Sequence, residues 1–395
     1  MTIQLASKLD KVKPSPTMAV TALAADLRAQ GRDVIGLGAG EPDFDTPDHI
    51  KAAAIDAINK GQTKYTAVDG IGPLKEAIVN KFKADNQLSY RPGEVLVSCG
   101  GKQSFYNLAQ AVLNDGDEVV IPTPYWVSYP DIALLAGATP VFAETSQAQA
   151  FKLSAEQLDD AITGKTRMVV LNSPSNPSGQ AYTQDELAAL GEVLKNYPDV
   201  LVATDDMYEH IIWSEAGFAN ILNACPDLTD RTVVLNGVSK AYAMTGWRIG
   251  YAAGPEPVIN AMKKVQSQST SNPTSVSQWA SAAALTGGNE CLAPMLKAFK
   301  ARHDFVVKSL NDMPGVECLT GDGTFYVFPG VHGAIERTEG TSNDVEFCSH
   351  VLDRAGVAIV PGSAFGVGGH ARLSFATDMG SLEKAMQRMG DLLAG

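Results

Sequence analysis

The chain has 395 residues, 45% of them hydrophobic, and at about 150 residues per domain this length predicts two or three domains with a sizeable core. The formal net charge of −13 argues against nucleic acid and anionic membranes as partners. Five widely spaced cysteines and six scattered histidines indicate neither a metal site nor a disulfide framework. No signal peptide or long apolar run is evident, so we expect a cytoplasmic protein without a membrane partner.

The N-terminal region predicts an arm over residues 1–17, because Pro14 and Pro16 disfavour regular structure. A helix is expected over 18–30 and a short strand over 34–37. A Gly-x-Gly sequence ending at Gly40 follows that strand. The third glycine of a dinucleotide fingerprint is missing, and Pro42 stands where its helix has to begin. A nicotinamide oxidoreductase is therefore disfavoured.

The middle of the chain alternates between strands and helices. After a helix over 48–60 and another ending near 85, strands are expected at 95–98, 117–122, 140–143, 167–172, 200–204 and 232–235, with helices after 101 and over 155–163 and 184–195. This alternation predicts an α/β protein with a mostly parallel sheet between helices. Ligands of such sheets bind beyond the carboxyl ends of the strands.

The last third predicts a smaller α+β unit. A helix is expected to end near 267, and a long alanine-rich helix from 275 into the low 300s would link the two units. Strands are expected around 316–319, 324–328, 357–360 and 371–375, and a final helix from 381.

Two segments favour a phosphate-bearing ligand. A glycine turn with Gly101 joins a strand to a helix that begins near Lys102, and helix N-termini attract phosphate. Alone, these glycines are equally compatible with a simple turn. Further on, Ser239 and Lys240 follow a strand, with Arg248 after seven more residues. A desolvated lysine amine is nucleophilic, and Ser and Arg can hold a phosphate, which together suit pyridoxal phosphate (PLP).

The run from Ser239 to Tyr251 resembles the PLP-lysine signature of class I aminotransferases, which are fold type I enzymes, and is similar to that of the bacterial aspartate aminotransferases. The resemblance covers nearly the whole chain, with the other motifs in the family's order. It implies a large PLP-binding domain over 48–297 with a mostly parallel seven-stranded sheet. It also implies a small α+β domain made of 18–47 and 298–395.

The resemblance also implies roles for the cofactor site. Lys240 would hold PLP covalently and move the substrate proton, while Asp205 faces the pyridine nitrogen and Tyr208 the phenolic oxygen. Asp205 and Asp206 could otherwise form a solvated pair or ligate a metal without histidine support. The implied cofactor-binding residues are Gly101, Lys102, Trp126, Asn176, Asp205, Tyr208, Ser239, Lys240, Arg248 and, from the partner chain of a homodimer, Tyr65.

For the substrate, the resemblance makes Arg372 the fork that binds the α-carboxylate, although an arginine in an apolar strand is also compatible with a structural salt bridge. The other implied substrate-binding residues are Gly40, Trp126, Asn176, Lys102, Ser15 and Thr17. Residues 265–271 contain no arginine or lysine, so Lys102 is the expected partner of a second carboxylate. Thr324 stands where the family usually has alanine.

The implied reaction is ping-pong transfer of an amino group between aspartate or glutamate and 2-oxoglutarate or oxaloacetate. A prephenate or broader aromatic aminotransferase is the alternative within the family, and a PLP-dependent lyase is a further one. A non-catalytic PLP-binding regulator is disfavoured because the chain has no basic extension for DNA.

Overall fold

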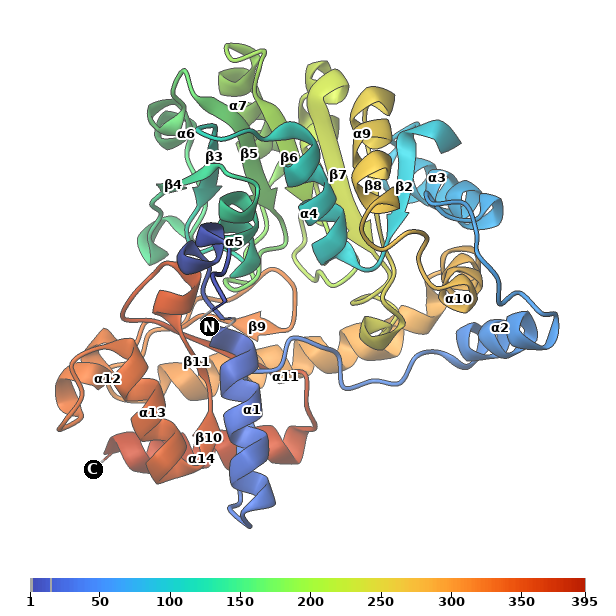
Figure 1. Ribbon diagram of the computed structural model, residues 1–395. Coiled ribbons are helices and arrows are strands. Elements are labelled where there is room, and N and C mark those ends of the chain that lie inside the picture. The colour runs from blue at the N-terminus through green and yellow to red at the C-terminus, as the bar shows by residue number, and fades with distance from the viewer. Residues whose placement is uncertain (1–2, 15, 395) are drawn as a thin grey trace.

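The computed structural model describes residues 3–14 and 16–394, and its central element is a seven-stranded sheet (Figure 1). In spatial order the strands are β2 (Val95–Ser98), β8 (Gly250–Ala253), β7 (Thr232–Gly237), β6 (Leu201–Asp205), β5 (Thr166–Asn172), β3 (Glu118–Pro122) and β4 (Thr139–Ala143). Strand β8 runs antiparallel to both neighbours, and the other pairs are parallel. The prediction of a mostly parallel seven-stranded α/β sheet is confirmed.

Both faces of this sheet are covered by helices, because its strands are apolar on both sides. In β2, for example, Val95 and Val97 join one core while Leu96 joins the other, as side-chain alternation requires. The Leu96 side is covered by α4 (Gly101–Val112), α5 (Ser128–Leu135) and α9 (Glu256–Ser267). The other side is covered by α2 (Asp48–Asn59), α3 (Gly72–Asn86), α6 (Ala155–Ala161), α7 (Gln184–Lys195), α8 (Ile221–Ala224) and α10 (Ser275–Thr286).

A second core lies below the sheet in Figure 1, built around Phe299, Phe325, Phe347 and Phe375. Its helices are α11 (Ala293–Asn311), α12 (His332–Arg337), α13 (Asp344–Ala355) and α14 (Met379–Ala394), with α1 (Pro16–Ala29) packed alongside. Its strands are β9 (Tyr326–Val327), β11 (Val360–Pro361) and β12 (Ala371–Ser374) in one antiparallel sheet, and the parallel pair β1 (Ile35–Gly36) and β10 (Val357–Ala358). The predicted domain boundaries stay a prediction.

The expected arm and the expected linking helix were both wrong in part. The arm contains a 3-10 helix, Ser7–Lys11, and α1 already begins at Pro16, because proline is tolerated in the first turn of a helix. The long alanine-rich helix is two helices, α10 and α11. Gly288, with φ of +78°, lies between them in the left-handed region that ends helices.

The strands of the second unit are shorter than predicted. Residues 316–319 form only an isolated bridge between Glu317 and Gly330. Thr324 has a φ of +67°, so the extended backbone begins only at Tyr326. The segment 357–360 divides between two different sheets. Within residues 3–14 and 16–394, no helix is long and apolar enough to span a membrane.

Candidate active site

The candidate residues meet at the carboxyl edge of the sheet because of strand order. Asp205 is the last residue of β6 and lies opposite Asn172, the last residue of β5. Lys240 follows β7, the next strand on the other side, in the turn that begins after Gly237. Parallel strands end at the same edge, so the three segments that carry Asn176, Asp205 and Lys240 converge.

The Asp205 carboxylate is fixed by two donors. Tyr129 donates to Oδ2 at 2.6 Å, and the Met207 N–H donates to Oδ1 at 3.2 Å. Loss of hydration raises the pKa of Asp205, and these two hydrogen bonds oppose the rise. Burial and the neighbouring Asp205 raise the pKa of Tyr129 well above its usual range, so the phenol keeps its proton and is the donor. The carboxylate is therefore held in one orientation.

The Lys240 side chain lies among Gly40, Tyr208 and Phe325. Its Nζ donates to the Gly40 carbonyl at 2.5 Å and lies 5.9 Å from the centre of the Tyr208 ring and 5.8 Å from that of Phe325. Burial and the positive charge of Arg372 lower the pKa of Lys240 to about 8. Near neutral pH, far more of this amine is then neutral and nucleophilic than of an ordinary lysine amine.

Arg372 is a buried cation, 2% exposed, in strand β12. It donates to Asn176 Oδ1 at 3.0 Å and to the Gly38 carbonyl at 2.7 Å, while its Nε finds no hydrogen-bond partner among the described residues. Within the described part of the chain it forms no salt bridge, which removes the support for a structural ion pair. A buried guanidinium without a carboxylate is costly, and a ligand carboxylate would compensate that cost.

Two sources of positive potential meet at the start of α4. Arg248 donates to the Thr245 carbonyl at 2.8 Å and to the Cys99 carbonyl at 3.4 Å, and none of the described carboxylates pairs with it. Gly100, with φ of +93°, precedes the helix, and a Cβ added there would lie 2.4 Å from an Arg248 nitrogen. The free N–H groups of the helix start and the unpaired arginine together suit an anion. Ser239 is buried in the neighbouring turn.

The remaining predicted residues differ in how close they lie to the cluster around Lys240, Asp205 and Arg372. Lys102 places its Nζ 5.2 Å from the centre of the half-buried Trp126 ring, and burial together with Arg248 lowers the pKa of its amine. Thr17 lies in the first turn of α1, and Ser15 is outside the described residues. Tyr65 is 93% exposed, and no described contact joins it to this cluster within one chain.

Two tyrosines at the site were not predicted from the sequence. Tyr129 anchors Asp205, and Tyr326 places its hydroxyl 3.2 Å from the hydroxyl of Tyr208. In the sequence, Tyr129 lies three residues after Trp126, and the two rings are in contact in the structure. Aromatic residues grouped in this way more often pack in a core than act at a site, so the sequence did not single out Tyr129. Only the fold brings it to the end of β6.

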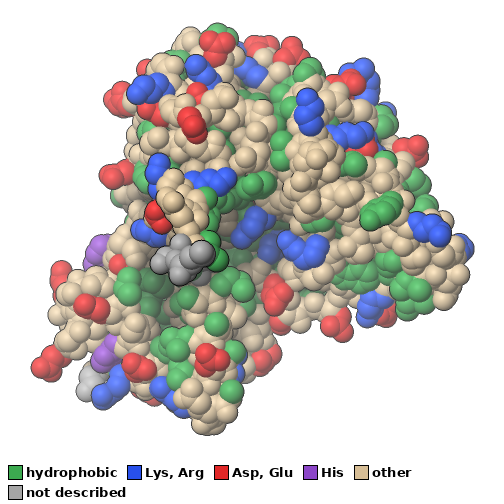
Figure 2. Space-filling model, in the orientation of Figure 1, with side chains coloured by type: hydrophobic (Ala, Val, Ile, Leu, Met, Phe, Trp, Pro, Cys, Tyr) green, Lys and Arg blue, Asp and Glu red, His purple; other side chains and the backbone are tan. Residues whose placement is uncertain are grey.

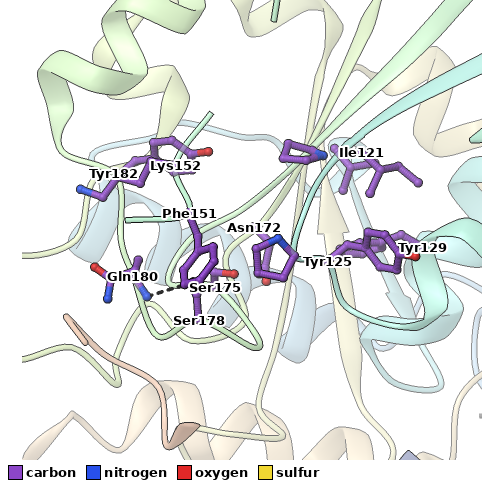
Figure 3. A pocket seen from close by; sticks show the side chains of 13 residues that line it. Ile121, Tyr125, Tyr129, Phe151, Lys152, Asn172, Ser175, Ser178, Gln180 and Tyr182 are labelled. Carbon is purple, nitrogen blue, oxygen red and sulfur yellow. Dashed lines mark hydrogen bonds between the residues drawn. The ribbon is translucent and has the colours of Figure 1, made fainter. Parts of the chain in front are cut away.

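The surface of the site is hollowed. Figure 2 shows Lys and Arg side chains along a hollow between the sheet and the lower unit. Beside Tyr129, a small cavity of about 30 Å³ is bordered by Tyr125, Asn172, Ser175 and Tyr182 (Figure 3). That volume holds about one water molecule, so this cavity is too small for substrate. Among the described residues, no cluster of three or more His, Cys, Asp or Glu could hold a metal.

The strand order of the sheet, with Asn176, Asp205 and Lys240 at its carboxyl edge, is that of a fold type I enzyme. The model of the family "Aminotransferase class I and II" matches residues 32–389, and the chain belongs to this family. It is an aminotransferase, as its motifs predicted.

Named relatives are similar over nearly the full length. An "Aspartate/prephenate aminotransferase" of Nitrosomonas europaea is 58% identical over 99% of this chain and 100% of its own. An "Aspartate aminotransferase" of Geobacillus stearothermophilus is 48% identical over 98% of both. The crystal structure of the Rhizobium meliloti aspartate aminotransferase superposes with a TM-score of 0.96 at 46% identity, covering 100% of this chain and 99% of that one. The Thermus thermophilus enzyme with maleate gives 0.94 at 40%, covering 99% and 100%.

Proposed function

We propose that this aminotransferase uses PLP to transfer the amino group between aspartate or glutamate and 2-oxoglutarate or oxaloacetate in a ping-pong cycle. The observation that carries the proposal is the position of the Lys240 amine, which donates to the Gly40 carbonyl at the carboxyl edge of the sheet and lies 5.9 Å from the centre of the Tyr208 ring. Arg372 and Asp205 both influence the charge of this amine, so the three groups lie close enough to interact. PLP-dependent chemistry on amino acids needs these groups: an amine, a cation that binds a carboxylate and a fixed carboxylate.

The side chains present fit PLP. The Arg248 and Gly101 end of the site suits its phosphate, with Ser239 adjacent, and Asp205 suits its pyridine nitrogen. Tyr208 and Asn176 are the candidates for its phenolic oxygen, and Trp126 for its ring face. Because Asn176 Oδ1 accepts from Arg372, the amide nitrogen of Asn176 is free to donate to a ligand. When bound, PLP supplies an aldehyde for an amine and a ring that accepts electrons from the α-carbon.

Four residues of the site would have different roles in the reaction. Lys240 would hold the cofactor through its amine, and the same amine, when free, would move the substrate α-proton as base and then as acid. Asp205 keeps a proton on the ring nitrogen. Arg372 grips the α-carboxylate with the N–H groups that Asn176 and Gly38 leave unused. The exposed backbone at Gly40 lets the substrate approach closely.

A preference for dicarboxylates is supported by Lys102, an amine beside Trp126 at the edge of the site. The names of the Nitrosomonas and Geobacillus relatives and the maleate bound by the Thermus enzyme support the same preference. Prephenate also has two carboxylates and is the alternative acceptor. We further propose a cytoplasmic homodimer in which the exposed Tyr65 reaches the partner's phosphate site, with Thr17 near the substrate entrance.

A substrate panel tests this function. Aspartate, glutamate, aromatic and aliphatic amino acids are offered as donors, with oxaloacetate, 2-oxoglutarate and prephenate as acceptors. Pyridoxamine phosphate should form in proportion to the oxo acid released, whereas a lyase would release product without it. Borohydride reduction and peptide mapping should place the cofactor label on Lys240, and a label on Lys102 or Lys264 would contradict the assignment.

A further inference from the structure

Tyr326 joins two groups of the site that are otherwise separate. It is the first residue of β9, pairs with Ser374 of β12 and is 1% exposed. Its ring centre lies 4.4 Å from the Arg372 guanidinium carbon, and its hydroxyl lies 3.2 Å from that of Tyr208. One side chain therefore touches both the candidate carboxylate-binding group and the candidate partner of the phenolic oxygen.

The ring of Tyr326 completes the environment of Arg372. Hydrogen bonds to Asn176 and Gly38 fix two nitrogens of the guanidinium, but they do not fill the space beside its face. Tyr326 fills that space, with the Phe365 ring 4.9 Å from the same carbon. A desolvated cation is attracted to an aromatic face, so the ring both stabilises the guanidinium and limits its movement.

The hydroxyl of Tyr326 determines whether the Tyr208 O–H can donate a hydrogen bond to a ligand. A tyrosine has one O–H donor, so Tyr208 can donate either to Tyr326 or to a bound ligand. When Tyr326 donates, Tyr208 keeps its proton for the ligand. An O–H group that accepts a hydrogen bond also becomes a stronger donor. The 3.2 Å contact allows either direction, and only donation by Tyr326 is compatible with Tyr208 donating to the cofactor.

We propose that Tyr326 is a positioning residue, which holds Arg372 with its ring and directs the Tyr208 proton with its hydroxyl. This inference rests on the proposed function. It divides the role of one side chain into two parts that different substitutions separate: Tyr326→Phe removes the hydroxyl and keeps the ring, whereas Tyr326→Leu removes both.

The experiment compares wild type, both variants and Tyr182→Phe as PLP-loaded proteins. Tyr182 is a matched control because it is also a buried tyrosine, whose hydroxyl accepts from the Leu153 N–H. Maleate binding, followed by calorimetry, reports on Arg372 without turnover. The pH titration of the visible absorbance of the bound cofactor reports on Tyr208. If the leucine chain does not fold, Tyr326→Met supplies the ring-free comparison.

We expect Tyr326→Phe to bind maleate as wild type does, to shift the absorbance midpoint upward by about half a pH unit and to lower kcat about three- to tenfold. The ring-free variant should also weaken maleate binding on the order of tenfold. An unchanged midpoint in Tyr326→Phe, or wild-type maleate affinity in the ring-free variant, would overturn this inference alone. A wild-type protein that neither binds PLP nor transfers amino groups would overturn the proposed function and this inference with it.

Discussion

Tyr129 donates a hydrogen bond of 2.6 Å to the carboxylate of Asp205, and the two residues come from different elements, the first turn of α5 and the end of β6. Tyr129 is 1% exposed and lies in ring contact with Phe105 and Trp126, which fix its position. A side chain 76 positions away in the sequence therefore stabilises the ionised form of Asp205 and orients its carboxylate.

Replacing Tyr129 with phenylalanine should impair Asp205. The carboxylate loses a charge-assisted hydrogen bond, so its pKa rises further and it holds a pyridinium less well. Hydrogen bonds to charged groups contribute about 1.5–3 kcal/mol, which predicts a loss in kcat/KM on the order of 10- to 100-fold, and the acid limb of the pH profile should move to higher pH. Tyr197→Phe is the control, because it removes a 2.7 Å bond to Asp159 outside the site. Equal effects of both substitutions would contradict the role of Tyr129.

The reactivity of Lys240 should depend on Arg372. The arginine cation disfavours the protonated amine, so Arg372→Met should raise the pKa of Lys240 from about 8 towards the ordinary lysine value. In cofactor-free protein, competitive acetylation followed by mass spectrometry measures this pKa, since only the neutral amine reacts. The pH at which half of Lys240 is acetylated should move higher in the variant, and the labelling of the exposed Lys264 serves as the internal control for the reagent. A downward shift would contradict the electrostatic account.

Lys102→Ala should selectively harm dicarboxylate substrates. Because Lys102 is exposed here, we expect a fall in kcat/KM for aspartate and glutamate equivalent to about 2 kcal/mol, the lower end of the cost of truncating one partner of a buried charge pair. Aromatic monocarboxylate donors should lose much less, and Lys264→Ala should leave both classes unchanged. The measurement is kcat/KM for each donor. Equal losses for both classes would mean that Lys102 serves the cofactor instead.

A shared site predicts complementation between two inactive chains. When a Lys240→Ala chain and a Tyr65-impaired chain form a mixed dimer, one of the two sites contains both intact residues. Activity should reappear after subunit exchange, up to about one quarter of wild type if exchange is random and each intact site acts alone. A mixture of two Lys240→Ala preparations serves as the blank. Verified mixed dimers without activity would exclude the contribution of Tyr65 from the neighbouring chain.

The buried pair of Lys81 and Glu209 should stabilise the segment that carries Asp205 and Tyr208. The side chains of both residues are at most 3% exposed, and Glu209 also accepts from Asn86 at 2.6 Å and from Asn236 at 2.7 Å. Lys81→Met removes the lysine cation from a buried carboxylate, which keeps only His210, at 3.6 Å, and the two asparagines as partners, so the free energy of unfolding should fall by about 3 kcal/mol.

An exposed pair supplies the control for this measurement. Lys300→Ala breaks the surface contact with Asp304, which should contribute less than about 1 kcal/mol. Urea unfolding of both variants measures the difference. Similar losses would mean that burial does not distinguish the two pairs.

The sequence by itself predicted the α/β class, the parallel orientation of most strands in the sheet and the segments that carry Asn176, Asp205 and Lys240. These features depend on local information, namely apolar runs of strand length and polar residues directly after them, and the motif resemblance added the family. The same local patterns did not predict the helix break at Gly288 or the late start of the strand after Thr324, because each depends on one residue with a positive φ.

Only the tertiary structure decided which side chains meet. The hydrogen bond from Tyr129 to Asp205 and the contacts of Tyr326 with Arg372 and Tyr208 join residues distant in sequence. Arg372 Nε, in turn, has no hydrogen-bond partner among the described residues. No local pattern encodes such contacts, because they arise where packed elements converge. The roles predicted for the site residues remain predictions, but the physical reason for testing them is this convergence: Arg372, a buried cation that pairs with none of the described carboxylates, lowers the pKa of Lys240.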